Sequence, residues 1–329
     1  MPLIDIFLSP ADLSIRDQFA GMSPAEVINM QMGNRQNQMG SSFRIPAVAA
    51  GVLAIMLGFS ASLGAQNLGW EGETGIFVTP LAYTAGAEGK LAEPVVGFHF
   101  LDAGPVIGQF YEASIEVGLG RRFEVGYTSD IHAQGGNTEL SPLWHNGFNI
   151  FNGKFILVPE NYKKQAWLPA VSLGFIARTQ VHNVGGAIMN QDTANGDIYM
   201  VASKTITQTK PIPIVLSGGV RGTNAELWGM AGNAPNWQAR GFGAVAFVFK
   251  GPKSSTIILG SEVSQQPLHP QYLPGANIPT TLTYCVRVVP MSKQKLNFDF
   301  GIAQVAGEIA PGVNLQARSQ VGVQVSYGF

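Results

Sequence analysis

The chain has 329 residues, with 40 glycines, 20 prolines, only 12% charged residues and a formal net charge of −1. This composition favours strands and turns over a helical bundle, whose surface needs more Lys, Glu and Arg. The charge balance, equal in acids and bases beyond residue 65, excludes the basic surface of a nucleic-acid-binding protein, and the single Cys285 excludes a disulfide framework or a multi-cysteine metal site.

Residues 43–66 form the most apolar stretch and predict a secretory signal peptide. Arg44 precedes an uncharged run at 45–59, and small residues follow at 60–65. The run is shorter than the roughly 20 residues that a membrane-spanning helix needs. We expect cleavage after Ala65, with Gly64 as the next candidate, and assign 39–65 to the signal peptide and 66–329 to the mature chain.

Residues 1–38 carry more acid than base, which does not suit the start of a signal peptide. A start at Met32 or Met39 would give a short, positively charged leader. We infer that translation begins at one of these two methionines. A genuine N-terminal extension is the alternative.

Alternation of apolar and polar residues recurs beyond residue 66 and predicts β-strands. The clearest hairpin lies at 113–130, where Ile115, Val117 and Leu119 share one face and a Gly-Arg-Arg turn follows. A second hairpin pairs 148–159 with 166–180. The other candidate strands are 70–84, 95–101, 198–206, 212–223, 241–249, 256–264, 280–289, 296–303 and 313–329.

These segments make thirteen candidates, and single-chain bacterial barrels use even strand numbers. Twelve strands are expected, with fourteen as the alternative. The segment at 70–84 is the weakest, because Pro80 cannot donate a hydrogen bond to a neighbouring strand.

Three features favour lipid over a protein core around these strands. Many strands have about nine or more residues, the length that crosses a bilayer when tilted. Their polar face carries Gly, Ser, Asn, Gln and isolated charges rather than a dense charged surface. The predicted signal peptide exports the chain, and a sheet is stable in lipid only when it closes. The fold class expected is therefore all-β: a closed antiparallel transmembrane β-barrel of about 12 strands in the bacterial outer membrane, with long loops on one side.

The chain ends on VGVQVSYGF, in which apolar residues alternate up to a final aromatic residue. With 313–320 in the same register, one strand could occupy most of the last seventeen residues. The ending resembles the C-terminal sorting signal of outer-membrane barrels, with Val325, Tyr327 and Phe329 as its apolar positions. This resemblance implies outer-membrane lipid and the outer-membrane assembly machinery as partners.

The stretches GDIYMVASKTIT, VRGTNAELWGMAGN, LGSEVSQQPLHP and NFDFGIAQVAGEI resemble a family of uncharacterised bacterial outer-membrane β-barrels that is known only as a domain of unknown function. With LVPENYKKQAWLPAVSLGF, the resemblance covers roughly residues 110–329. Separately, GETGIFVTPLAYTA at 72–85 is similar to the opening of barrels linked to exopolysaccharide export. The first resemblance implies location and fold, and the second implies envelope polysaccharide or its export apparatus as a partner.

Charged residues on the polar faces are candidates for lining a pore. They are Glu116, Glu124, Lys154, Arg178, Arg221, Glu262, Arg287, Asp299 and Arg318. Opposing charges set selectivity in some channels. The same charges could instead pair with one another and fill the lumen, because twelve strands lie between the filled barrel of about 8 and the open channel of 16 or more.

Enzyme chemistry finds little support in the sequence. The five histidines are His99, His132, His145, His182 and His269; none adjoins a G-x-S-x-G motif or has metal-ligand spacing, and all but His99 fall in loop-like stretches. We predict no catalytic residues, metal or cofactor. The leading hypothesis is a passive diffusion channel for small polar solutes, the second a non-conducting structural or polysaccharide-associated barrel, and the third an outer-membrane lipid hydrolase.

Overall fold

The computed structural model describes residues 67–85, 91–120, 122–139, 141, 147–180, 194–209, 211–230, 233–267, 280–290, 296–304, 308–310, 313–314 and 320–328. Its strands are β1 Leu91–Asp102, β2 Gln109–Leu119, β3 Phe123–Ala133, β4 Phe148–Val158, β5 Ala170–Gln180, β6 Asn195–Ile206, β7 Ile214–Ala225, β8 Asn233–Lys250, β9 Thr256–Ser264, β10 Thr281–Val289, β11 Leu296–Gln304, β12 Glu308–Ala310, β13 Val313–Asn314 and β14 Gln320–Gly328. Its short helices are α4 Gly104–Ile107, η2 Tyr162–Lys164, η3 Glu226–Gly229 and η4 Pro252–Ser254. None of the described helices is long and apolar enough to cross a membrane.

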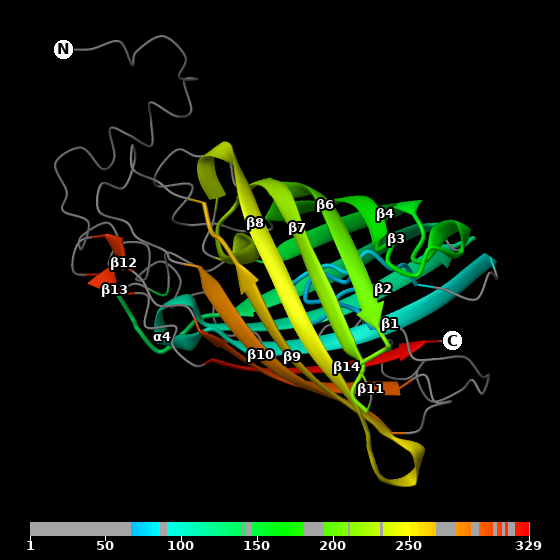
Figure 1. Ribbon diagram of the computed structural model, residues 1–329. Helices are drawn as coiled ribbons and strands as arrows, with labels where there is room; N and C mark the ends of the chain where they lie inside the picture. Colours follow the sequence, from blue (N-terminus) through cyan, green and yellow to red (C-terminus); the bar gives the residue numbers. More distant parts are fainter. Residues whose placement is uncertain are drawn as a thin grey trace, which may run out of the picture. The chain divides into compact units, whose positions relative to one another are not determined.

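Twelve antiparallel strands close into a barrel in the order β1-β14-β11-β10-β9-β8-β7-β6-β5-β4-β3-β2 (Figure 1). The closure pairs the first strand with the last, with Val95 opposite Gly328 and Leu101 opposite Gly322. The ring leaves no free edge among these strands, as a sheet in lipid requires. The predicted number of strands and the closed fold class are therefore confirmed.

The two faces of the wall differ as the alternation predicts. In β10 the burial of successive side chains alternates between buried and exposed. Large apolar side chains face outward; Phe123, Val125, Phe300 and Ile302 each expose between 45% and 53% of their surface. Such an apolar outer band on a closed barrel is what the hydrocarbon of a bilayer solvates. The barrel is thus a transmembrane one.

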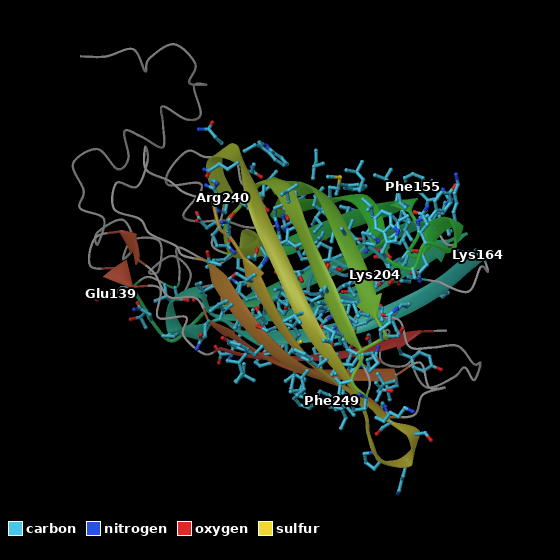
Figure 2. The ribbon with its side chains drawn as sticks, in the orientation of Figure 1. Glu139, Phe155, Lys164, Lys204, Arg240 and Phe249 are labelled. Carbon is cyan, nitrogen blue, oxygen red and sulfur yellow. The ribbon has the colours of Figure 1, made fainter. Side chains whose placement is uncertain are left out.

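The connections differ in length at the two ends of the barrel. The short-turn end holds 120–122, 159–169, 207–213, 251–255 and 290–295, together with the C-terminal end of β14. The long-loop end holds 134–147, 181–194, 226–232, 265–280 and 305–319, as well as the short 103–108. Figure 2 shows Lys164 and Lys204 toward the first end and Glu139 and Arg240 toward the second. In outer-membrane barrels short turns face the periplasm and long loops face outward.

Two expectations from the sequence are wrong. Residues 70–84 do not form a wall strand but lie inside the barrel. Gly72 has a φ of +90°, and side chains of the wall form hydrogen bonds with the backbone of this segment. The final strand is also shorter than expected. It begins at Gln320, whereas Val313–Asn314 pairs with Glu308–Ala310 in a separate two-stranded sheet. Alternating apolar and polar residues indicate an extended segment with two different faces, but they do not show which strand or surface that segment packs against.

The predicted sorting signal is described only in part. Val325 and Tyr327 lie on β14, and the side chains of both are half-buried. Val325 is opposite Phe98 of β1, and Tyr327 is opposite Val96. Phe329 lies outside the described residues, as do residues 1–38, the predicted signal peptide at 39–65 and Arg318.

Candidate functional site

The lumen of the barrel is occupied by residues 67–85, which we call the plug. Apart from the half-buried Tyr83, every residue of the plug is buried. In Figure 1 the plug is the blue trace inside the ring of strands, and its side chains and backbone contact residues of β1 to β6, β9, β10, β11 and β14. The plug therefore spans the cross-section of the barrel rather than lining one side.

Glu262 of β9 is the strongest single anchor of the plug. Its carboxylate accepts hydrogen bonds from the backbone N–H groups of Phe77 at 3.0 Å, Val78 at 3.1 Å and Thr79 at 2.9 Å, and from the Thr79 hydroxyl at 2.7 Å. Whereas other N–H groups of the plug, such as that of Ile76, donate to carbonyls within it, these three consecutive N–H groups find their acceptor on the wall. Hydrogen bonds to a charged acceptor are about twice as strong as neutral ones.

A second anchor lies on β3 and β4, where Lys154 Nζ is 2.7 Å from Glu124 Oε1. Lys154 also donates to the carbonyl of Thr74 at 2.9 Å. Glu124 in turn accepts from the Thr74 backbone N–H at 3.1 Å, the Thr74 hydroxyl at 2.7 Å and the Ala85 N–H at 2.7 Å. The pair is fully buried, and the plug satisfies the remaining hydrogen-bonding positions that a buried ion pair needs.

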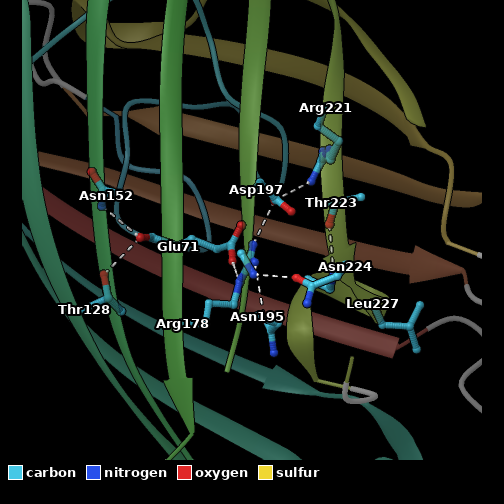
Figure 3. A network of polar contacts seen from close by, with 12 residues as sticks. Glu71, Thr128, Asn152, Arg178, Asn195, Asp197, Arg221, Thr223, Asn224 and Leu227 are labelled. Atoms are coloured by element: carbon cyan, nitrogen blue, oxygen red, sulfur yellow. Dashed lines mark hydrogen bonds and ion pairs between the residues drawn. The ribbon is translucent and has the colours of Figure 1, made fainter. Parts of the chain in front are cut away.

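A third anchor centres on Arg178 of β5 (Figure 3). Its guanidinium donates to Glu71 of the plug and, at 3.0 Å, to Asp197 of β6. Arg221 of β7 reaches the same Asp197 oxygen at 3.3 Å and lies 4.7 Å above the ring of Phe242. Two arginines and two acids thus form one buried network, in which a single acid comes from the plug.

Glu71 is also fixed through its backbone. Its carbonyl accepts hydrogen bonds from the Thr128 hydroxyl and from the Asn152 side chain, each at 3.1 Å (Figure 3). Further along the plug, Ala82 donates to the Ser203 hydroxyl at 2.9 Å and accepts from the Ser172 hydroxyl at 2.6 Å. Small hydroxyl residues of the wall therefore face plug backbone rather than solvent.

Apolar contacts complete the seating of the plug. The ring of Phe77 lies against Gly301 and Gly322, where an added Cβ would stand 2.9 Å and 2.5 Å from ring carbons. A side chain at either glycine would displace the ring. At the long-loop end Trp70 packs edge-on against Phe110 of β2 with ring centroids 6.4 Å apart.

Two short helices fold inward at the long-loop end. In α4 Val106 and Ile107 are buried, and in η3 Leu227 and Trp228 are buried. Together with Trp70 most of these residues belong to one apolar cluster that also includes Phe110. The plug and these two helices therefore occupy the described lumen.

Eight of the nine charged residues that we predicted for the lumen lie buried on the inner side of the wall: Glu116, Glu124, Lys154, Arg178, Arg221, Glu262, Arg287 and Asp299. Arg318 lies outside the described residues. The structure brings together Glu124 with Lys154, Arg178 with Arg221 through Asp197, and Arg287 with Asp299 at 2.8 Å. Arg287 also donates to the carbonyl of Ile76 in the plug.

Three inward acids of the wall strands and two acids of the plug, Glu71 and Glu73, were missed in the sequence. Glu112 and Asp130 follow the same two-residue phase as Ser114 and Thr128. Asp130 already lay within the predicted hairpin, and extending its first strand by one residue would have added Glu112. Asp197 precedes the predicted strand at 198–206 by one residue. Glu71 was missed because its segment was taken for a strand, and no sequence signal indicated that it would enter the lumen.

Two of the histidines can be placed. His99 of β1 is buried, and its Nδ1 lies 3.4 Å from Glu112 Oε2. His132 lies in β3 rather than in a loop, and it stacks on Phe110 at 4.3 Å. Both rings are buried in this state. His145, His182 and His269 lie outside the described residues, and within the described ones no group of three His, Cys, Asp or Glu residues could hold a metal ion.

One plug carboxyl has an unusual protonation equilibrium. Burial, reinforced by the neighbouring Glu71, raises the pKa of Glu73 to about 8. The positive charge of Lys154 opposes this shift without cancelling it. Glu73 is therefore largely protonated near neutral pH while the plug is seated.

Comparison with known proteins shows no family for this chain. No family model matches the chain, and no curated protein matches it. Among solved structures, the KdgM porin is 10% identical, with 71% of this chain and 99% of that chain covered and a TM-score of 0.43. The NanC porin is 8% identical; the match covers 72% of this chain and 98% of that chain, with a TM-score of 0.40. An outer membrane channel from Pseudomonas putida F1 is 6% identical; the match covers 73% of this chain and 96% of that chain, with a TM-score of 0.43. Likeness at this level carries no argument about function.

Proposed function

We propose that this protein is an outer-membrane channel for small polar solutes that rests closed, with residues 67–85 as its gate. The observation that carries the proposal is the chemistry of the contact between plug and wall. Glu262, Lys154 and Ser203 hold plug backbone by hydrogen bonds that water could equally make. The protein reaches this membrane through the outer-membrane assembly machinery and is surrounded there by outer-membrane lipid.

A polar wall favours a channel over a solid cylinder. A barrel that serves only as a structural element could fill its lumen with well-packed apolar side chains, which are often as stabilising as buried ion pairs. Here the inner wall carries eleven buried charged side chains among the described strand residues. With the plug displaced, these side chains and the freed serine and threonine hydroxyls would line a hydrophilic passage, as in water-filled barrels.

The second candidate is a non-conducting barrel associated with envelope polysaccharide. The apolar cluster inside the lumen favours it, because Trp70, Phe77 and Leu81 of the plug are buried there with wall residues. Displacing them exposes apolar surface at a cost of about 25 cal/mol per Å². Under this alternative the plug never leaves, and mild detergent extraction should recover envelope polysaccharide or its export proteins with the barrel.

Replacing Glu262 with alanine tests the gate. The substitution removes the acceptor of four plug hydrogen bonds, and losing even two bonds to a charged acceptor costs about 3 kcal/mol. We expect the open probability in planar-bilayer recordings to rise about a hundredfold over the unmodified protein, because each 1.4 kcal/mol is a factor of ten.

The matched control is Glu139→Ala, which removes an exposed acid outside the lumen. This control should leave the recordings unchanged. Silence of both the unmodified protein and the Glu262→Ala variant, with both folded in the bilayer, would exclude the channel and leave the non-conducting barrel.

The opening of the channel should also depend on pH through Glu73. A carboxyl whose pKa is raised to about 8 in the seated plug binds its proton more tightly there than in water. The seating of the plug is therefore most stable below the pKa of the exposed group and weakens as the pH rises toward 8. We expect open probability to increase between about pH 5 and 8, and Glu73→Gln to flatten this increase; a profile unaffected by the substitution would contradict the role of Glu73.

A further inference from the structure

The charges on the inner wall are not balanced. Among the described strand residues, the buried acids are Glu112, Glu116, Glu124, Asp130, Asp197, Glu262 and Asp299, and the buried bases are Lys154, Arg178, Arg221 and Arg287. Seven acids thus face four bases. Glu71 and Glu73 belong to the plug and would leave with it, so they do not enter this balance.

Every one of the four bases has an acid partner on the wall itself. Lys154 pairs with Glu124 at 2.7 Å and Arg287 with Asp299 at 2.8 Å. Arg178 and Arg221 share Asp197, at 3.0 Å and 3.3 Å. Removing the plug therefore leaves each positive charge next to a carboxylate that screens it from a passing solute.

The remaining acids have no such partner. Within the described part of the chain, no Lys or Arg nitrogen lies within ion-pair distance of Glu112, Glu116, Asp130 or Glu262. His99 is the neighbour of Glu112, at 3.4 Å. These four carboxyls have no basic partner; because Arg178 and Arg221 share the single Asp197, the net excess of acid over base on the described wall is three.

Three of the four acids form one strip. Glu112 and Asp130 are opposite each other in the pairing of β2 with β3. Glu116 lies on the same face of β2 as Glu112, four residues further along and two beyond Ser114. The strip therefore runs along the barrel axis on two adjacent strands. A solute passing through the opened lumen would travel beside it.

Buried polar atoms of the strip and of β6 have no hydrogen-bond partner among the described residues. Oδ1 of Asp130, in a side chain only 5% exposed, accepts no hydrogen bond from the described residues. The hydroxyl of Tyr199, in a side chain 2% exposed on the inner side of β6, likewise has no described partner. An amine or ammonium group could donate to both kinds of oxygen.

We propose that the opened lumen selects cations, and that the solutes it passes are small polar molecules carrying an amine or another positive charge. The proposal rests on the proposed channel function and names its substrate class. Carboxyl groups in contact with water are ionised at neutral pH, so the unpaired acids become a fixed negative field once the plug moves. Clefts lined by one sign of charge concentrate the opposite ion, and rings of Asp and Glu select cations in channels.

The test uses the full chain with Ser172→Ala and Ser203→Ala, which removes two plug hydrogen bonds without changing any charge. The reversal potential is measured across a gradient of potassium chloride at pH 7.5 and low ionic strength. We expect potassium to be preferred over chloride by about tenfold, the lower end of such focusing effects. Tetramethylammonium should pass and gluconate should not.

Adding Glu112→Gln, Glu116→Gln and Asp130→Asn removes the strip and should abolish the preference for potassium, whereas the exposed Glu139→Gln should leave it intact. A conducting channel that prefers chloride, or shows no preference before the strip is altered, overturns the cation proposal while leaving the channel function standing. A folded barrel that never conducts in any variant overturns both. If the triple variant does not fold, the reversal potential measured with the wall acids intact still tests whether the lumen prefers cations.

Discussion

Arg178→Met is expected to lower the free energy of unfolding by about 3–5 kcal/mol, the usual cost of removing one partner from a buried ion pair. Methionine replaces much of the volume but none of the five N–H donors. Glu71 loses its only described basic partner, and Asp197 keeps Arg221 alone. Urea unfolding in lipid vesicles, followed by tryptophan fluorescence, measures the change, because Trp70 and Trp228 are both buried in the folded barrel.

The control for this prediction is Lys204→Met at the short-turn end. Lys204 pairs with Glu160 at 3.2 Å, but both side chains retain solvent exposure of nearly one fifth. Such a pair contributes about 1 kcal/mol or less. Equal and small effects of the two substitutions would contradict the buried network that Figure 3 displays.

The Arg178 network also explains how a plug can be both stable and removable. Asp197 satisfies Arg178 and Arg221 from within the wall, so both cations keep a partner when Glu71 withdraws. Water can then replace the lost carboxylate. A plug that was the sole partner of a buried cation would be held far more tightly, because its departure would leave that charge uncompensated.

The wall of the barrel could be predicted from the sequence because each strand carries its own evidence. Ile115, Val117 and Leu119 alternate with Glu116 and Gly118 whatever the strand pairs with, and a two-residue period leaves only one orientation when one face meets lipid. The inward position of Glu124, Lys154 and Arg287 followed from the same phase.

The plug could not be predicted in this way. Residues 70–84 contain enough apolar residues to read as a strand, and only Pro80 argued against that reading. What places the segment in the lumen is a set of long-range bonds, such as Thr79 to Glu262 and Glu71 to Arg178. No local pattern encodes such contacts, so the choice between an open and a filled lumen was not available from the sequence.

The measurement that tests the central claim most directly uses the native Cys285 to trap the plug. A Cβ at Gly260 would lie 2.8 Å from Cys285 Sγ and 3.4 Å from Cγ2 of Ile76, so the Ile76 and Cys285 side chains both lie against Gly260, within one buried apolar cluster. A cysteine introduced as Ile76→Cys should therefore be within reach of a disulfide with Cys285. The same substitution combined with Cys285→Ser is the matched control.

Oxidation of the Ile76→Cys protein in membranes should link residues 76 and 285, detected by peptide mass spectrometry, and should abolish channel openings until a reductant restores them. The control should show neither the link nor the loss of openings. Failure to form the link in folded barrels would contradict the seating of residues 67–85 inside the lumen, and openings that persist in fully linked protein would contradict their role as the gate.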